Sequence, residues 1–267
     1  MILASASPLS LTLAIAVAAG YSVSAMGATR LGTRAAKTLV WLAWLAHGVL
    51  LTMGMFGTVP RFGFAPALSV TAWLIAAVYA IESHLYPLLQ TRWALSALGA
   101  VAVLLAALFP GSPLHATASP WLPLHWALGI ASYGLFGAAV VHAWFMTRAE
   151  ERFRVAADPD SGMPLLTIER LTFRFVAAGF LLLSATLLVG LLFESQLYSS
   201  TKPLKWYYEM GFSVLSWLTF AALIVGRARF GWRGKRAVRV LYIGAGLLLL
   251  AYVGSRFVLE IVLGRAP

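Results

Sequence analysis

Charged residues are scarce in this sequence: they make up 11% of its 267 residues, whereas 61% are hydrophobic. A soluble domain usually carries about a quarter charged residues, so the mean hydropathy of +0.84 excludes an ordinary soluble fold. Cysteine is absent altogether, and the chain therefore has no disulfide, no thiolate ligand and no thiol nucleophile. Glycine and proline are close to ordinary usage, which excludes fibrous and low-complexity classes.

Long stretches of the chain contain no Asp, Glu, Lys or Arg. They are residues 1–29, 38–60, 62–81, 93–147, 175–193, 210–226 and 240–255. About 20 apolar residues cross the hydrocarbon core of a bilayer, and the longest stretch has room for two crossings divided by the run Pro110-Gly111-Ser112-Pro113. We therefore predict an all-α, polytopic membrane helical bundle in which residues 1–267 form a single integral membrane domain. The eight expected transmembrane helices lie near residues 9–28, 38–59, 68–89, 93–109, 124–147, 174–196, 210–227 and 239–263.

The basic residues are distributed unevenly between the two sides of this predicted bundle. Fifteen of the twenty Lys and Arg residues follow the first, third, fifth and seventh helices, and five lie on the other side. The positive-inside rule then places both termini outside the cytoplasm. A net charge of +11 could also indicate a nucleic-acid partner, but anionic lipid headgroups account for basic loops at these positions. We therefore expect membrane lipid and no nucleic acid as a partner.

The expected membrane interior has few ionisable groups, and the chain has few motifs that indicate chemistry. No carboxylate falls at a predicted midplane, which disfavours an ion-coupled transporter. A Walker A sequence, a dinucleotide fingerprint, G-x-S-x-G and H-E-x-x-H are all absent. The residues thus favour a binding protein over an enzyme, without settling that question.

Histidines are the polar residues that remain as candidates for a site. His47 is ten residues into its helix, near mid-membrane, where an imidazole needs a partner. His125 is in the first turn of its expected helix, after Pro123 and between Trp121 and Trp126. Half-buried imidazole in such an apolar setting can ligate haem iron, although packing at the bundle end is the alternative. We expect the break at Pro123 to open a cavity there.

Other histidines and tryptophans have plainer explanations. For His84 and His142, near the expected inner helix ends, we expect hydrogen-bonded packing roles. Most tryptophans fall near helix ends and fit a headgroup-level aromatic belt. Trp121, Trp126 and Trp206 gather at the expected outer side, where they could instead offer flat faces to a large planar ligand.

Several segments together resemble the cytochrome c assembly protein family, in its short eight-helix branch of HemX-like and YpjD-like relatives of CcsA. The resemblance is strongest over residues 115–260. It rests on the runs LHWALGIASYGLF at 124–136, PLLTIERLTFRF at 164–175, LLVGLLFESQLY at 187–198, FGWRGKRAVR at 230–239 and LAYVGSRFVLE at 250–260. These motifs are more specific for the family than for any one reaction.

The resemblance implies a protein of the bacterial cytoplasmic (inner) membrane that binds haem or hands it on. By position, His125 matches the family's outer histidine, and His47 matches a histidine in the second helix. Tyr208 stands where many short-branch relatives have another histidine, before Ser213-Val214-Leu215-Ser216-Trp217, and a tyrosine can also ligate ferric haem. Arg256 could hold a haem propionate if Glu260, one turn away, does not pair with it.

Two functional hypotheses from different classes follow. The first is a haem-handling factor of cytochrome complex assembly, with His125 as the iron ligand, Trp121 and Trp126 beside it, and an apocytochrome or another membrane protein as partner. The second is a non-haem accessory protein that stabilises or regulates a transporter or other membrane partner, which the tyrosine at position 208 favours.

Overall fold

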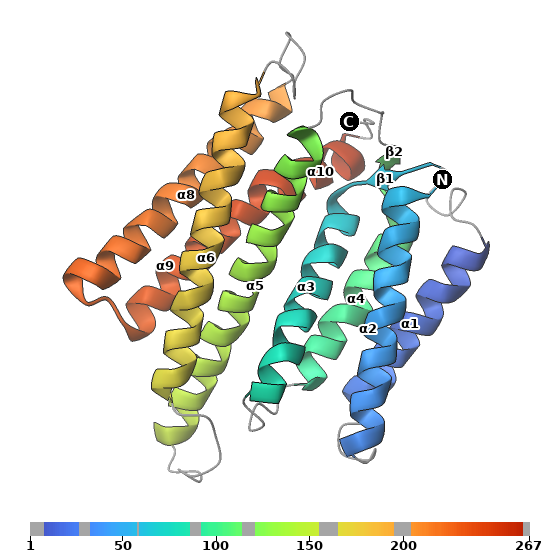
Figure 1. Ribbon diagram of the computed structural model, residues 1–267, viewed down its shortest axis with the longest axis horizontal. Helices are drawn as coiled ribbons and strands as arrows, with labels where there is room; N and C mark the ends of the chain where they lie inside the picture. The colour runs from blue at the N-terminus through green and yellow to red at the C-terminus, as the bar shows by residue number, and fades with distance from the viewer. Residues whose placement is uncertain are drawn as a thin grey trace. The chain divides into compact units, whose positions relative to one another are not determined.

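The computed structural model describes residues 8–26, 33–57, 59–85, 92–113, 121–154, 165–194 and 204–263, and nearly all of these are helical (Figure 1). The helices are α1 (Pro8–Met26), α2 (Thr33–Phe56), α3 (Phe64–Leu85), α4 (Arg92–Leu108), α5 (Trp121–Arg154), α6 (Leu165–Leu192), α8 (Leu204–Phe230) and α9 (Gly234–Leu249). The last helix continues through η2 (Leu250–Gly254), α10 (Ser255–Phe257) and η3 (Val258–Val262). Two short strands, β1 (Arg61–Phe62) and β2 (Ser112–Pro113), complete the described elements.

The described helices confirm the predicted all-α membrane bundle. Six of them are long and apolar enough to cross a membrane, among them α1, α5 and α6. The other two, α3 and α4, contain shorter apolar stretches at Phe64–Ala80 and Ala94–Leu108. Each of the eight expected helices is therefore found within the described residues.

The helix ends differ from the predicted ends because a charge-free stretch shows which residues lie in the hydrocarbon layer. It does not show where the helix begins or ends. A helix can continue past the apolar layer into water, and α5 does so as far as Arg154. Helix α8 likewise begins at Leu204, six residues before its charge-free stretch. Pro123 is the third residue of α5 and so lies in its first turn, where a missing N–H breaks no helical hydrogen bond. The expected break at Pro123 is therefore not present, and His125 sits one turn into the helix.

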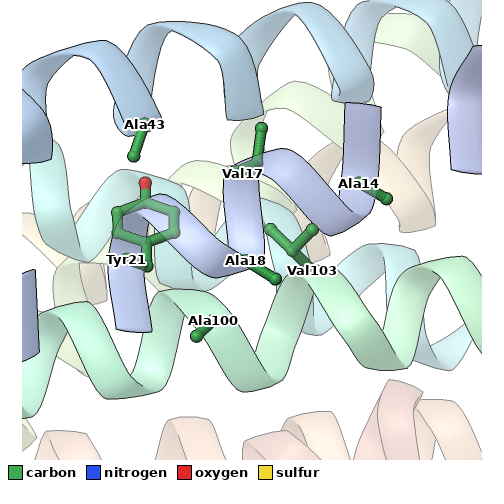
Figure 2. Close-up of a cluster of buried hydrophobic side chains, with 7 residues drawn as sticks. All are labelled: Ala14, Val17, Ala18, Tyr21, Ala43, Ala100 and Val103. Carbon is green, nitrogen blue, oxygen red and sulfur yellow. The ribbon is translucent and has the colours of Figure 1, made fainter. Parts of the chain in front are cut away.

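By its internal packing the chain divides into two compact units. Unit 1 comprises Met1–Ile81, Gln90–Ala116 and Arg256–Pro267, and unit 2 comprises Glu82–Leu89 and Thr117–Ser255. In unit 1, helix α1 packs against both α2 and α4 through small residues that let the backbones approach closely. Figure 2 shows this core, with the Tyr21 hydroxyl directed toward α2. Its buried members are Ala14, Val17, Ala18, Tyr21, Ala43, Ala100 and Val103.

A short antiparallel ribbon joins the segment that follows α2 to the segment that follows α4. Arg61 pairs with Pro113, and Phe62 pairs with Ser112. Gly111 makes the turn into β2 with φ +78°, and a Cβ at this position would lie 2.5 Å from the Phe62 carbonyl. Only glycine fits such a backbone approach. Arg61 Nη1 donates to the Gly111 carbonyl oxygen at 3.2 Å, which fixes this side chain between the end of α2 and the start of α3.

Unit 2 is built from two antiparallel helix pairs, α5 with α6 and α8 with α9, which run side by side in Figure 1. The rings of Phe136 and Phe220 stack in its core with centroids 3.7 Å apart. Tyr133 donates its hydroxyl to the Leu248 carbonyl oxygen, just before the π-helical turn η2. Trp217 donates to the Ser184 hydroxyl at 2.8 Å and so ties α8 to α6. These bonds satisfy polar groups that the membrane interior could not hydrate.

The sequence of residues 148–174, a charged segment between two expected membrane helices, predicts solvated charges, but Glu169 departs from this prediction. It is buried, and its Oε1 accepts from Arg227 Nη1 at 2.5 Å, with Arg233 Nε at 3.8 Å. The Arg227 guanidinium also lies 3.7 Å from the centre of the Phe173 ring. The pair therefore joins the start of α6 to the end of α8. Residues 155–164 of the same segment lie outside the described residues.

We expect Glu169→Gln to lower stability substantially, because it leaves the Arg227 charge half-buried without its carboxylate. Breaking a buried pair costs about 3–5 kcal/mol, and the partial exposure of this pair reduces that to roughly 2–3 kcal/mol. The apparent melting temperature of detergent-solubilised protein measures the effect. Glu150→Gln on α5 is the control, since the described residues give Glu150 no ion pair. Equal melting temperatures for both variants would show that the pair contributes nothing.

The orientation of the bundle is a separate prediction that depends on the 15-to-5 asymmetry of Lys and Arg. Reporter fusions at residues 155–162 should give a cytoplasmic signal, and fusions at residues 115–119 an external one. Both insertion points lie outside the described residues. The opposite pattern would reverse the assignment of every loop.

Candidate functional site

His125 lies on the face of α5 that packs against α6. Its Nδ1 is 3.1 Å from the backbone carbonyl oxygen of Thr186. A carbonyl oxygen only accepts hydrogen bonds, so Nδ1 must carry the proton and donate it. In the neutral ring, Nε2 then keeps its lone pair. This is the arrangement in which protein imidazoles bind metals, with the second nitrogen donating to a carbonyl that orients the ring.

The close approach of His125 to α6 depends on Gly190. A Cβ at Gly190 would lie 3.2 Å from Cε1 and 3.6 Å from Nδ1 of His125. Glycine therefore leaves the space that the imidazole ring occupies. Thr186 and Gly190 are four residues apart on one face of α6. The Thr186 carbonyl oxygen accepts from Nδ1 of the His125 ring, and Gly190 lies next to its Cε1.

Aromatic residues lie close to His125 in the chain and at the end of the α5–α6 interface. Trp121, one turn before His125, stacks on Phe193 of α6 with ring centroids 3.9 Å apart and an interplanar angle of 9°. Trp126 is half-buried next to His125 in the chain. Trp206 lies on α8 and meets Tyr207 edge-on at 5.1 Å. The Trp121–Phe193 pair makes the end of the α5–α6 interface apolar and flat.

Tyr208 is placed differently from the other candidates of unit 2. It lies in the second turn of α8, and its side chain is 54% exposed. Within the part of the chain that the structure describes, no hydrogen bond or ring contact joins Tyr208 to His125. The structure thus gives Tyr208 a surface position, whereas it packs His125 between two helices.

His47 is buried in unit 1 between two hydroxyl groups. Its Nε2 is 2.8 Å from Ser69 Oγ, and its Nδ1 is 3.4 Å from the Tyr21 hydroxyl. Only 1% of the residue is exposed. Hydroxyl groups donate and accept, so both nitrogens are satisfied and the midplane imidazole has the partners that we expected it to need. His47 also borders a cavity of about 660 Å³ within unit 1.

The remaining candidates are divided between the two units. Arg256 belongs to unit 1, in α10, and is half-buried, while the side chain of Glu260 and all of His115 lie outside the described residues. His142 is buried in unit 2 with Nδ1 2.8 Å from the Ala138 carbonyl oxygen of its own helix. The structure therefore brings together His125 and Trp121, and it places His47 and Arg256 in the other unit.

Sequence reasoning did not find Thr186 and Gly190. The pattern Thr-x-x-x-Gly within the apolar run of α6 is a small-residue face of the kind that marks close helix contacts in membranes. That pattern could have indicated a packing face, but not which ring would meet it. The buried pair of Glu169 and Arg227 was likewise hidden, because the two residues are 58 positions apart.

The sequence model of the cytochrome C assembly protein family matches residues 33–263. The chain belongs to the cytochrome c assembly protein family. The match covers most of the described helices and confirms the resemblance drawn from the motifs between residues 124 and 260.

Individual relatives share moderate identity with the chain. It is 31% identical to the inner membrane protein YpjD of Escherichia coli K12 over 152 residues, which is 55% of this chain and 56% of that relative. It is 30% identical to a 28.8 kDa protein of Azospirillum brasilense over 74% of this chain and 76% of the relative. It is 24% identical to the cytochrome c biogenesis protein CcsA of Prochlorococcus marinus MED4 over 83% of this chain and 70% of the relative.

The match to YpjD thus spans little more than half of that relative's length. No solved structure gives a significant match to the chain. Together with the six candidate spans, the comparisons confirm the expected multi-pass location in the bacterial inner membrane.

Proposed function

We propose that this protein handles haem during cytochrome c assembly and that His125 is an axial ligand of the haem iron. The observation that carries the proposal is the orientation of His125: its Nδ1 donates to the Thr186 carbonyl oxygen and leaves the Nε2 lone pair for a metal. Membership of the cytochrome c assembly family supports a role connected with haem in general.

The surroundings of His125 suit a large planar ligand. The stacked Trp121 and Phe193 rings give the α5–α6 interface an apolar end one helical turn from the imidazole. An apolar shell around an iron ligand limits solvent access and tunes the iron. The chain has no cysteine, so any thioether bond to haem must use cysteines of the apocytochrome. The chain's own contribution is then to bind and orient haem beside that partner.

A genetic and a spectroscopic measurement test the proposed role together. A strain without this gene should lose c-type cytochromes on haem-stained gels and regain them with the wild-type chain. The purified wild-type protein, expressed with haem supply, should show a Soret band and contain haem in a defined ratio to protein. Well-folded protein without haem, in a strain with normal c-type cytochromes, would contradict the proposal.

The exposure of Tyr208 favours a second candidate function. Where the motifs of the family lead us to expect another histidine, this chain has a tyrosine whose side chain is 54% exposed and does not meet His125. A non-haem accessory protein would keep the fold and lose the second ligand. Haem-free, folded wild type that co-purifies with a membrane transporter would support this reading.

A further inference from the structure

Unit 1 contains a cavity that the proposed haem site does not use. It has a volume of about 660 Å³, within the range of pockets that hold drug-sized ligands. Helix α2 lines it from His47 to Met55, which is about 12 Å along the helix axis, and Gly57 continues the wall just past the end of the helix. The other walls come from α1, α3 and α4. The cavity is thus about as deep as one leaflet of the hydrocarbon core.

The polar groups of the cavity are at its two ends. Arg61 borders it just beyond the end of α2, and His47 and Ser69 border it at mid-helix. The walls between these ends are largely apolar, with side chains such as Leu50, Val70 and Val103. A ligand that fits has an apolar body about one leaflet long and a polar group near Arg61.

The charge of Arg61 indicates that this polar group is anionic. The Gly111 carbonyl oxygen is the one partner that the described residues give its guanidinium, and no carboxylate pairs with it there. A guanidinium has five N–H donors in a fork that matches phosphate and carboxylate oxygens. At the end of a membrane helix, an unpaired cation beside an apolar cavity is stabilised by an anionic headgroup.

One side of the cavity is open for entry. Met53 is 38% exposed, and Gly54 is also exposed. A Cβ at Gly54 would meet no atom within 4 Å. An acyl chain can therefore enter between helices from the surrounding bilayer.

We propose that this cavity binds one anionic phospholipid, with its phosphate at Arg61 and an acyl chain running toward His47. The depth of one leaflet, the apolar walls and the cation at headgroup level match that occupant. Haem is also an anionic amphiphile, but both nitrogens of His47 face hydroxyl groups at 2.8 and 3.4 Å, so none is directed at an iron in the cavity. The lipid site is independent of the proposed function, since its residues are all in unit 1.

Lipid retention tests this proposal with two cavity variants and two matched controls. Gly54→Leu fills the open space, and Arg61→Gln removes the headgroup cation. The control Gly246→Leu changes a helical glycine that likewise has nothing within 4 Å of its Cβ, and Arg229→Gln removes an exposed arginine of α8. Each protein is reconstituted with a minority of phosphatidylglycerol in phosphatidylcholine, and native mass spectrometry counts the retained lipid.

Wild type and both controls should retain one phosphatidylglycerol, and both cavity variants should retain about tenfold less, as expected for loss of one charge-assisted bond or of the space itself. Equal retention by all five proteins would overturn the proposal. Loss of a Soret band in the cavity variants, with lipid unchanged, would also overturn it and make haem the occupant.

A second measurement needs no variant and therefore no assumption about folding. Wild type is irradiated in the presence of phosphatidylglycerol that carries a photoreactive group in its acyl chain. Cross-links should concentrate in residues 47–57, at and just after the end of α2, and in residues 103–110, at and just after the end of α4. Cross-links spread evenly over exposed positions of α5, α6, α8 and α9 would show that the lipid is only part of the surrounding bilayer.

Discussion

Replacement of His125 by alanine should abolish most of the haem content of this protein, whereas replacement of His47 should leave it nearly unchanged. Loss of a residue that only orients a metal ligand already costs about 10–100-fold in affinity, so loss of the ligand itself should cost at least about 100-fold. His47 differs because its two nitrogens already face Ser69 and Tyr21 in the core of unit 1. Optical spectra of wild type, His125→Ala and His47→Ala, purified with haem supply, measure the effect.

Rescue by free imidazole separates a ligand from a packing residue. In His125→Ala the space between α5 and α6 is left open beside Gly190, and added imidazole can enter it and restore the Soret band. A packing role would lower protein yield without such rescue. A Soret band that His125→Ala keeps unchanged would remove His125 as the ligand. Loss of the Soret band in His47→Ala alone would instead assign the iron site to His47 in unit 1.

The number and order of helices could be predicted because a bilayer imposes a simple rule on the sequence. Charge-free stretches of about 20 residues are costly to place anywhere but in hydrocarbon, and each expected helix was found. The same rule cannot locate helix ends, because a charged residue such as Arg154 is compatible with a helix that extends into water. Pro123 was misread for a related reason: proline breaks a helix interior but fits its first turn.

The partners of the candidate residues could not be predicted, because they come from distant parts of the chain. His125 and Thr186 are 61 positions apart, and their hydrogen bond exists only once α5 and α6 pack together. The sequence gives no sign that Glu169 differs from the solvated charges near it, because its partner Arg227 lies on α8. Composition and depth identified His125 and His47 as unusual, but only packing shows that one has a nitrogen available to a metal and the other is satisfied by hydroxyl groups.

Gly190 provides the second large prediction, because it tests the orientation of His125 without changing His125. In Gly190→Ala the new Cβ would lie 3.2 Å from Cε1 of the ring, closer than an ordinary van der Waals contact. The ring must move by a few tenths of an ångström, which disturbs the 3.1 Å hydrogen bond from Nδ1 to the Thr186 carbonyl oxygen. Gly190→Val adds two further methyl groups and should displace the ring from the interface.

We expect haem affinity to fall severalfold in Gly190→Ala and by about 10–100-fold in Gly190→Val, the range known for residues that orient a metal ligand. Gly129→Ala is the matched control at the same helix interface, because its Cβ would lie an ordinary 3.6 Å from Thr186 Cγ2. Haem titration gives the affinity, and the electron paramagnetic resonance spectrum of the ferric protein reports the ligand orientation.

Thermal stability distinguishes a positioning role of Gly190 from a general packing role. Alanine in place of glycine favours a helix by about 1 kcal/mol, so Gly190→Ala should keep or raise the melting temperature of the haem-free protein while its haem affinity falls. A general packing defect would lower both. If Gly190→Ala bound haem as tightly as Gly129→Ala with the same spectrum, the contact between α6 and the His125 ring would have no part in holding haem, and the hydrogen bond to Thr186 would have to orient the ligand by itself.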